Sequence, residues 1–181
     1  MRLALIGPRG SGKSTVARLL AERGGVPVVS TDARVREKAE STIEALVEVR
    51  GWAYFREMET QVLQEVLAEH PDGLVLDTGG GLILDPNNRE DLGSMDHVVY
   101  MHADPEILAA RIAGETEDRP ALTDARRPVD EIRRVLAERE PIYRNLASIV
   151  IETDEATPEQ VCEQILDEIE KRAAAEKGAT G

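Results

Sequence analysis

Cysteine and aromatic residues are scarce in this sequence, and acidic residues outnumber basic ones. The single cysteine, Cys162, cannot form an internal disulfide, which indicates a reducing compartment such as the cytoplasm. Aromatic residues make up only 3% of the chain, so Leu, Val, Ile and Ala must build the core. The 35 acidic and 22 basic residues give a net charge of −13, which disfavours binding to nucleic acids or anionic membranes. An anionic small molecule can still bind where arginines gather locally.

Long apolar runs and metal-ligand clusters are also missing. The apolar run at residues 2–6 ends at a Gly-Pro pair and is too short for a signal peptide or a membrane span. His70, His97 and His102 have no cysteine or acidic cluster at metal-ligand spacing, so we expect no zinc site.

The length of 181 residues fits one domain, expected at residues 1–175, with a disordered tail at 176–181. Short apolar runs alternate with amphipathic segments, which is typical of a parallel sheet covered by helices. Strands are expected at residues 3–6, 26–30, 74–77, 97–101 and 149–152. Helices are expected at residues 13–23, 32–49, 54–69, 86–92, 104–112, 129–145 and 157–175, with a break around Gly51 and an interruption at Pro141. Residues 114–127 have little apolar content and are predicted to form a mobile loop.

The clearest motif is Gly-Pro-Arg-Gly-Ser-Gly-Lys-Ser at residues 7–14, which has the Walker A spacing between a predicted strand and a predicted helix. Its glycines let the backbone N–H groups point inward at phosphate oxygens, and the helix N-terminus adds positive potential. Lys13 is expected to reach the β- and γ-phosphates, and Ser14 to bind Mg²⁺. The alternative is a glycine-rich turn that fits by chance. We therefore expect ATP with Mg²⁺ on this loop, bound by Gly7, Arg9, Gly10, Ser11, Gly12, Lys13, Ser14 and Thr15.

Other polar and glycine residues follow the predicted strands at the edge where such sheets bind ligands. Asp32 is a candidate to orient an acceptor hydroxyl and take its proton, to cap the helix that follows, or to do both. The segment Gly79–Gly81 lets the backbone pass close to a ligand, a flexible turn being the alternative. Asp77 is a candidate Mg²⁺ ligand, or it orients the region around Lys13.

Taken in order, these pieces resemble the shikimate kinases, which belong to the nucleoside-monophosphate-kinase branch of P-loop proteins. The resemblance covers nearly the whole chain. It rests on the loop Gly-Pro-Arg-Gly-Ser-Gly-Lys-Ser-Thr, Asp32, Phe55-Arg56, Thr78-Gly79-Gly80-Gly81, Arg119-Pro120-Ala121-Leu122 and Arg139-Glu140-Pro141-Ile142-Tyr143.

The resemblance implies a three-layer α/β/α fold of the P-loop kinase type. It has a five-stranded parallel sheet in the order 2-3-1-4-5, acceptor-binding helices at about 32–69 and a mobile lid at about 114–127. It also implies that Arg56 and Arg139 grip a substrate carboxylate beside Asp32 and Gly79–Gly81. Arg119, on the lid, is expected to contact ATP and the transferring phosphoryl group.

The expected activity is transfer of a phosphoryl group from ATP to shikimate, as in aromatic amino acid biosynthesis, with Lys13, Asp32 and Arg119 as catalytic residues. The expected enzyme is a cytoplasmic monomer. Two positions depart from the family pattern, because Ser30 and Trp52 stand where the family has acids. Two alternatives therefore remain: a kinase of another hydroxy acid or polyol such as gluconate, or a nucleotide-binding relative with impaired catalysis.

Overall fold

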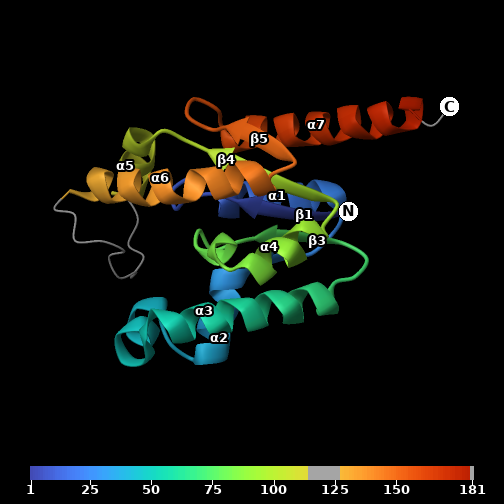
Figure 1. The fold of residues 1–181 in the computed structure, drawn as a ribbon. Coiled ribbons are helices and arrows are strands. Elements are labelled where there is room, and N and C mark those ends of the chain that lie inside the picture. The colour runs from blue at the N-terminus through green and yellow to red at the C-terminus, as the bar shows by residue number, and fades with distance from the viewer. Residues whose placement is uncertain (114–126, 180–181) are drawn as a thin grey trace.

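The computed structural model describes residues 1–113 and 127–179 (Figure 1). Its five strands form one parallel sheet in the order β2-β3-β1-β4-β5, which confirms the expected topology. The strands are β1 (Arg2–Ile6), β2 (Val28–Ser30), β3 (Leu74–Asp77), β4 (His97–His102) and β5 (Ile149–Glu152). The helices are α1 (Lys13–Gly24), α2 (Thr31–Ala39), α3 (Ile43–Glu69), the short 3₁₀ helix η1 (Leu82–Leu84), α4 (Pro86–Gly93), α5 (Pro105–Ile112), α6 (Pro128–Leu146) and α7 (Pro158–Ala179).

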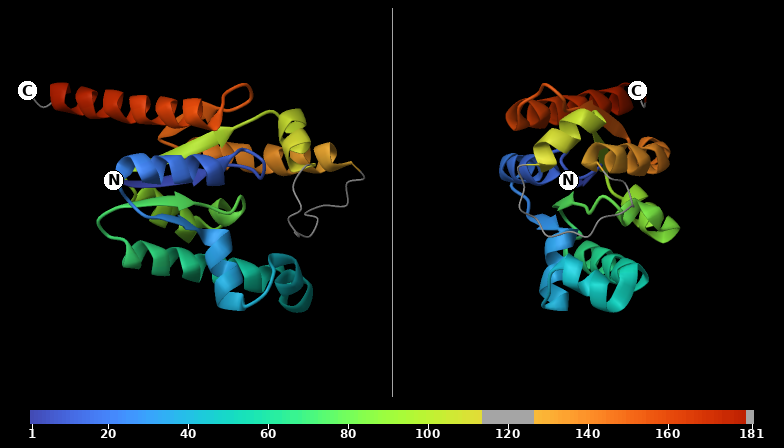
Figure 2. Two further views of the ribbon diagram at one scale, coloured as in Figure 1. Left: turned by 180° about the vertical axis from the view of Figure 1, so that it is seen from behind. Right: turned by 90° about the vertical axis from the view of Figure 1, so that its left-hand side faces the viewer.

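The sheet separates two hydrophobic cores, with helices on both of its faces (Figure 2). One core joins the sheet to α3, α4 and α6, and the other joins it to α1 and α7. Successive side chains of a strand point to opposite faces of the sheet, so each strand contributes to both cores. In β1, Ala4 and Ile6 face the first core, and Leu3 and Leu5 face the second. A strand buried on both faces needs a continuous apolar sequence, which is the pattern of the central strands here.

Helices α2 and α3 break at points that the sequence indicated only in part. A single helix at residues 32–49 was expected, and this prediction is wrong because α2 ends at Ala39 and Glu40 adopts a left-handed conformation with φ 50°. Thr42 then caps α3, accepting a hydrogen bond of 3.1 Å from the backbone N–H of Ala45. The expected break at Gly51 is confirmed, since its φ of 80° and ψ of 166° are not helical.

Three further features differ from expectation. Strand β2 begins at Val28 rather than at residue 26. The expected interruption at Pro141 is wrong, because Pro141 lies inside α6, which runs from Pro128 to Leu146. Helix α7 continues past residue 175 to Ala179. Among the residues that the structure describes, no helix combines the length and the apolar character needed to cross a lipid bilayer.

Candidate active site

The site begins at the loop that joins β1 to α1. Gly10 and Gly12 have φ of 81° and 88°, a left-handed conformation that favours glycine, so the loop depends on glycine at these points. Gly12 is the N-cap of α1 and offers no side chain to the first-turn N–H groups. Ser14 and Thr15 lie exposed on that turn. The first turn of α1 therefore presents backbone N–H groups and hydroxyls to a bound anion.

Lys13 opens α1, and its side chain turns back into the loop. Its Nζ donates hydrogen bonds to the carbonyl oxygens of Gly7 at 3.0 Å and Pro8 at 2.8 Å, and lies 3.4 Å from Oγ of Ser11. Only 8% of Lys13 is exposed, which is low for a lysine. The loop thus encloses a positive charge that is largely removed from water, a setting that suits phosphate oxygens.

Two acids and a serine meet at the carboxyl edge of the sheet beside this loop. Asp77, the buried last residue of β3, is in register with Leu5 of β1 and with Ser30 of β2. Ser30 caps α2, accepting from the backbone N–H of Ala33 at 3.4 Å. The prediction that Asp32 caps this helix is therefore wrong, because the helix begins one residue before it. Asp32 lies in the first turn of α2 and is half-buried.

Gly79 lies against this acidic corner. Its backbone N–H donates to Oγ1 of Thr31 at 2.9 Å. A Cβ on Gly79 would lie 2.5 Å from Oδ1 of Asp32 and 2.9 Å from Oε1 of Glu59. No larger residue fits at this position without displacing the two carboxylates, so the close approach accounts for the glycine.

Gly80 and Gly81 continue the strip between the phosphate loop and α3. A Cβ on Gly80 would lie 3.2 Å from the carbonyl oxygen of Gly7. A Cβ on Gly81 would overlap the guanidinium of Arg56. The glycine segment therefore brings the phosphate loop, Asp32 and Arg56 to one place, and this juxtaposition was expected from the sequence.

Arg56 projects from α3 and is held by its own helix. It forms an ion pair with Glu59, whose side chain is only 1% exposed, and its guanidinium lies 5.3 Å from the ring centre of Trp52. Phe55 anchors this turn in the core. Burial raises the pKa of the Glu59 carboxyl, and the guanidinium groups of Arg56 and Arg139 oppose that rise. An ionised Glu59 fixes the direction in which Arg56 points.

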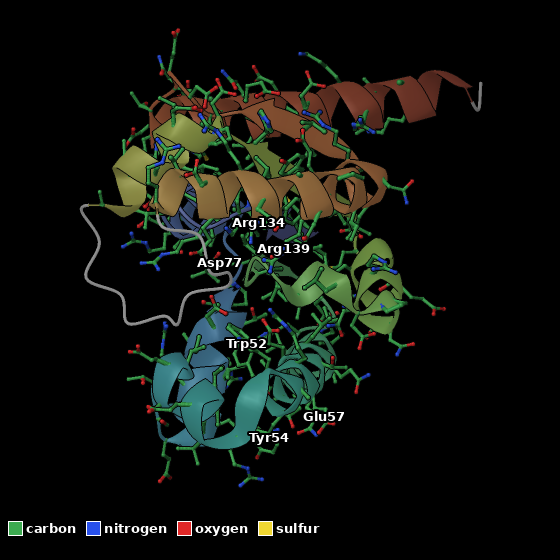
Figure 3. All side chains as sticks on the ribbon, turned by 60° about the vertical axis from the view of Figure 1, so that its left-hand side comes forward. Trp52, Tyr54, Glu57, Asp77, Arg134 and Arg139 are labelled. Carbon is green, nitrogen blue, oxygen red and sulfur yellow. The ribbon has the colours of Figure 1, made fainter. Side chains whose placement is uncertain are left out.

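Arg139 reaches the same place from α6. Its Nη1 donates to the carbonyl oxygen of Gly80 at 3.1 Å, and the Tyr143 hydroxyl donates to the same oxygen. Burial raises the pKa of Tyr143 to about 12, so the hydroxyl stays a donor at neutral pH. Figure 3 shows Arg139 reaching down from α6 and Trp52 up from α3, with Asp77 between them. Arg56 and Arg139 thus bring two guanidinium groups to the glycine segment, where the carboxylates of Asp32 and Glu59 also lie.

Comparison with known proteins gives the same family as the motifs. The family model for shikimate kinase matches residues 9–170. A shikimate kinase of Pseudomonas aeruginosa is 37% identical over 171 residues, which cover 94% of this chain and 97% of that protein. The chain belongs to the shikimate kinase family.

Solved structures agree with this assignment. The shikimate kinase from Acinetobacter baumannii in complex with shikimate superposes with a TM-score of 0.88 and 35% identity, covering 94% of this chain and 93% of that one. A gluconokinase from Sinorhizobium meliloti superposes with a TM-score of 0.63 at 17% identity, a likeness that concerns the fold alone. As a shikimate kinase family member, the chain is a kinase that uses ATP with Mg²⁺.

The residues of the phosphate loop fit that cofactor. The first turn of α1 has no side-chain cap, the buried Lys13 supplies a positive charge, and Ser14 exposes a hydroxyl. Asp77 supplies a carboxylate at the same edge of the sheet. Arg9 is half-buried, and its backbone nitrogen would lie 3.7 Å from a Cβ on Gly80.

The sequence analysis missed two residues that help to build this site. Glu59 was overlooked, although it lies three residues after Arg56 on the buried face of α3, a spacing that predicts an ion pair. Arg111 was also missed. Its Nη1 lies 3.4 Å from the carbonyl oxygen of Gly10 and 3.3 Å from Oγ1 of Thr153, which ties the phosphate loop to the segment after β5. Arg119 lies outside the described residues.

Proposed function

We propose that this protein transfers the γ-phosphoryl group of ATP to a hydroxyl of shikimate, giving shikimate 3-phosphate and ADP. The observation that carries the proposal is the wall formed by Arg56, Glu59 and Arg139 around the glycine segment, directly opposite the phosphate loop. Two guanidinium groups placed in this way can hold the carboxylate of shikimate through paired hydrogen bonds. Membership of the shikimate kinase family supports the same substrate.

The proposed roles divide between the two sides of the site. ATP supplies the phosphoryl group, and Mg²⁺ neutralises charge on its phosphates. Lys13 and the loop N–H groups hold the phosphates, while Arg56 and Arg139 grip the acceptor carboxylate through paired hydrogen bonds. Asp32 orients the acceptor hydroxyl and takes up its proton as transfer proceeds. Arg119 is proposed from the family resemblance to stabilise the transferring group.

The proposed metal ligands are Ser14 and Asp77. The family's acid after the second strand is Ser30 here, and Ser30 is in register with Asp77. Neighbouring strands lie about 4.8 Å apart, so the carboxylate of Asp77 lies close to the position that the family's acid would occupy at residue 30. Asp77 thereby compensates for the missing acid, by binding Mg²⁺ directly or through water.

We also propose that the chain forms one domain and acts as a monomer in the cytoplasm. Its single cysteine, Cys162, is a buried free thiol, which fits a reducing compartment. Size-exclusion chromatography with light scattering tests the monomer, for which the expected mass is 19.9 kDa.

Turnover tests the substrate directly. Release of ADP, measured by a coupled assay, is expected to appear when shikimate is added to enzyme, Mg²⁺ and ATP. Gluconate replaces shikimate in a parallel reaction, and a Lys13→Met preparation serves as the blank for contaminating kinases. Turnover with gluconate but not with shikimate would favour a gluconate-type kinase. ATP binding without turnover on either acceptor would favour a nucleotide-binding relative with impaired catalysis.

A methyl group at residue 81 tests the placement of Arg56. Gly81 has φ −104° and ψ −2°, which alanine adopts without strain, so the main effect of Gly81→Ala is to displace the Arg56 guanidinium. The KM for shikimate is expected to rise about tenfold, the equivalent of one charge-assisted hydrogen bond, while the KM for ATP stays unchanged. Gly93→Ala is the matched control, because a Cβ there meets nothing within 4 Å. Equal KM values in the two variants would contradict the assigned role of Arg56.

A further inference from the structure

Helix α6 packs against β4 through two adjacent side-chain pairs. Tyr100 and His102 are two residues apart on β4 and share one face of the strand, while Glu140 and Tyr143 share one face of α6. The rings of Tyr100 and Tyr143 stack with centroids 4.9 Å apart. Beside them, Nε2 of His102 lies 3.7 Å from Oε1 of Glu140. The second pair is ionic when the imidazole is protonated.

A third element reaches the same imidazole. His102 is in register with Glu152 of β5, and the Glu152 carboxylate contacts Nδ1 of His102. Each ring nitrogen therefore faces a carboxylate, one from α6 and one from β5. Both nitrogens are donors only in the imidazolium, whereas the neutral ring donates from one nitrogen alone. The protonated side chain can thus join three elements, and the neutral side chain can join two.

The groups around this imidazole are themselves paired or buried. Arg144 of α6 shares the Glu140 carboxylate at 2.7 Å, and its guanidinium lies 5.7 Å from the Tyr100 ring centre. The Tyr100 side chain is fully buried, and burial raises its pKa well above the usual range, so it stays neutral.

The clamped part of α6 is the part that faces the acceptor. Arg139 directly precedes Glu140, and Tyr143 lies one turn further on. Arg139 and Tyr143 both donate to the carbonyl oxygen of Gly80. A small rotation or slide of α6 on β4 therefore moves the Arg139 guanidinium relative to the glycine segment.

We propose that His102 is a positioning residue for the acceptor site, whose imidazole clamps α6 to β4 and β5 and so sets the placement of Arg139. This inference rests on the proposed function, because it assigns Arg139 to the acceptor. The clamp consists of two contacts of the ring, one with the Glu152 carboxylate of β5 and one with the Glu140 carboxylate of α6.

Steady-state kinetics test the clamp. In His102→Asn the KM for shikimate is expected to be about three- to fivefold above that of the wild type, the scale of a partly exposed ion pair. The KM for ATP is expected to change little. Glu152→Gln keeps the imidazole and the Glu140 contact, and should shift the KM in the same direction by less. His70→Asn is the matched control, because His70 also lies beside a carboxylate, that of Glu69 at 4.0 Å, but far from α6.

Two results would overturn the inference. One is an equal change in kcat and both KM values in His102→Asn, which indicates general destabilisation. The other is an unchanged KM for shikimate in His102→Asn. Hydrogen exchange of the α6 amides gives a readout that needs no turnover. Protection of these amides should be lower in His102→Asn than in the wild type, and unchanged in His70→Asn. Absent turnover together with lowered α6 protection in His102→Asn would reject shikimate as the substrate and keep the clamp, whereas unchanged α6 protection in this variant would reject the clamp itself.

Discussion

Lys13→Met is expected to lower kcat by about a thousandfold while the protein stays folded. The lysine is the positive charge at the centre of the phosphate loop, where its Nζ donates to two backbone carbonyls. In a site that excludes water, each donor that stabilises the charge of the transferring phosphoryl group raises kcat by about a hundred- to thousandfold. Methionine keeps the unbranched stem, so the packing of α1 should survive. The measurement is kcat at saturating shikimate and ATP.

The control for this variant is Lys171→Met on α7. Lys171 is an exposed lysine paired with Glu168 at 2.6 Å, so it loses the same charge far from the loop. Its kcat should match the wild type. Thermal unfolding of Lys13→Met should show only a small change in stability, because the desolvation cost of the buried ammonium and its hydrogen bonds to Gly7 and Pro8 are lost together. Retention of more than a tenth of wild-type kcat would show that Lys13 is not the residue that holds the phosphates.

Arg56→Ala is expected to lower kcat/KM for shikimate by about a hundred- to thousandfold and to destabilise the fold by about 2 kcal/mol. Both effects arise from one ion pair. The acceptor loses its guanidinium partner, and truncating one member of a hydrogen-bonded charge pair costs about 2–5 kcal/mol. Glu59, which is 1% exposed, is left buried without its nearest cation.

The double variant Arg56→Ala with Glu59→Gln separates these effects. Removing the orphaned carboxylate should restore most of the stability, because no unpaired charge remains buried, but it should not restore kcat/KM. The fluorescence of Trp52, the only tryptophan and a neighbour of Arg56, reports acceptor binding without turnover. Recovery of shikimate affinity in the double variant would mean that Arg56 serves the fold and not the acceptor.

Short motifs with fixed local geometry could be predicted from the sequence. The strand, glycine loop and helix at residues 2–24 form a unit whose spacing alone indicates phosphate binding, and the structure has these elements. The kink at Gly51 was predictable for the same reason, since a positive φ favours glycine. The break at Glu40 was not, because glutamate seldom adopts the left-handed conformation and only the Thr42 cap explains the new start.

Features that depend on packing between distant elements could not be predicted in this way. The spacing from Arg56 predicts the ion pair of Glu59, but it does not predict the contact with Gly79, which depends on how the glycine segment folds over α3. The cap of α2 was assigned to Asp32 because Ser30 also fits the strand, and only the register with Asp77 fixes where β2 ends. The contacts of His102 with Glu140 and Glu152 join residues from three elements, so no sequence window contains them.

The two cores on either side of the sheet have a consequence for how such an enzyme can diverge. The helix that starts at the phosphate loop, α1, packs in one core, whereas α3 and α6, which carry Arg56 and Arg139, pack in the other. Substitutions that adjust α3 or α6 therefore reach the nucleotide half through the sheet and through the glycine segment beside the phosphate loop. Acceptor choice can drift while the donor half is preserved, so the architecture works as a fixed phosphoryl donor module joined to an evolvable acceptor module.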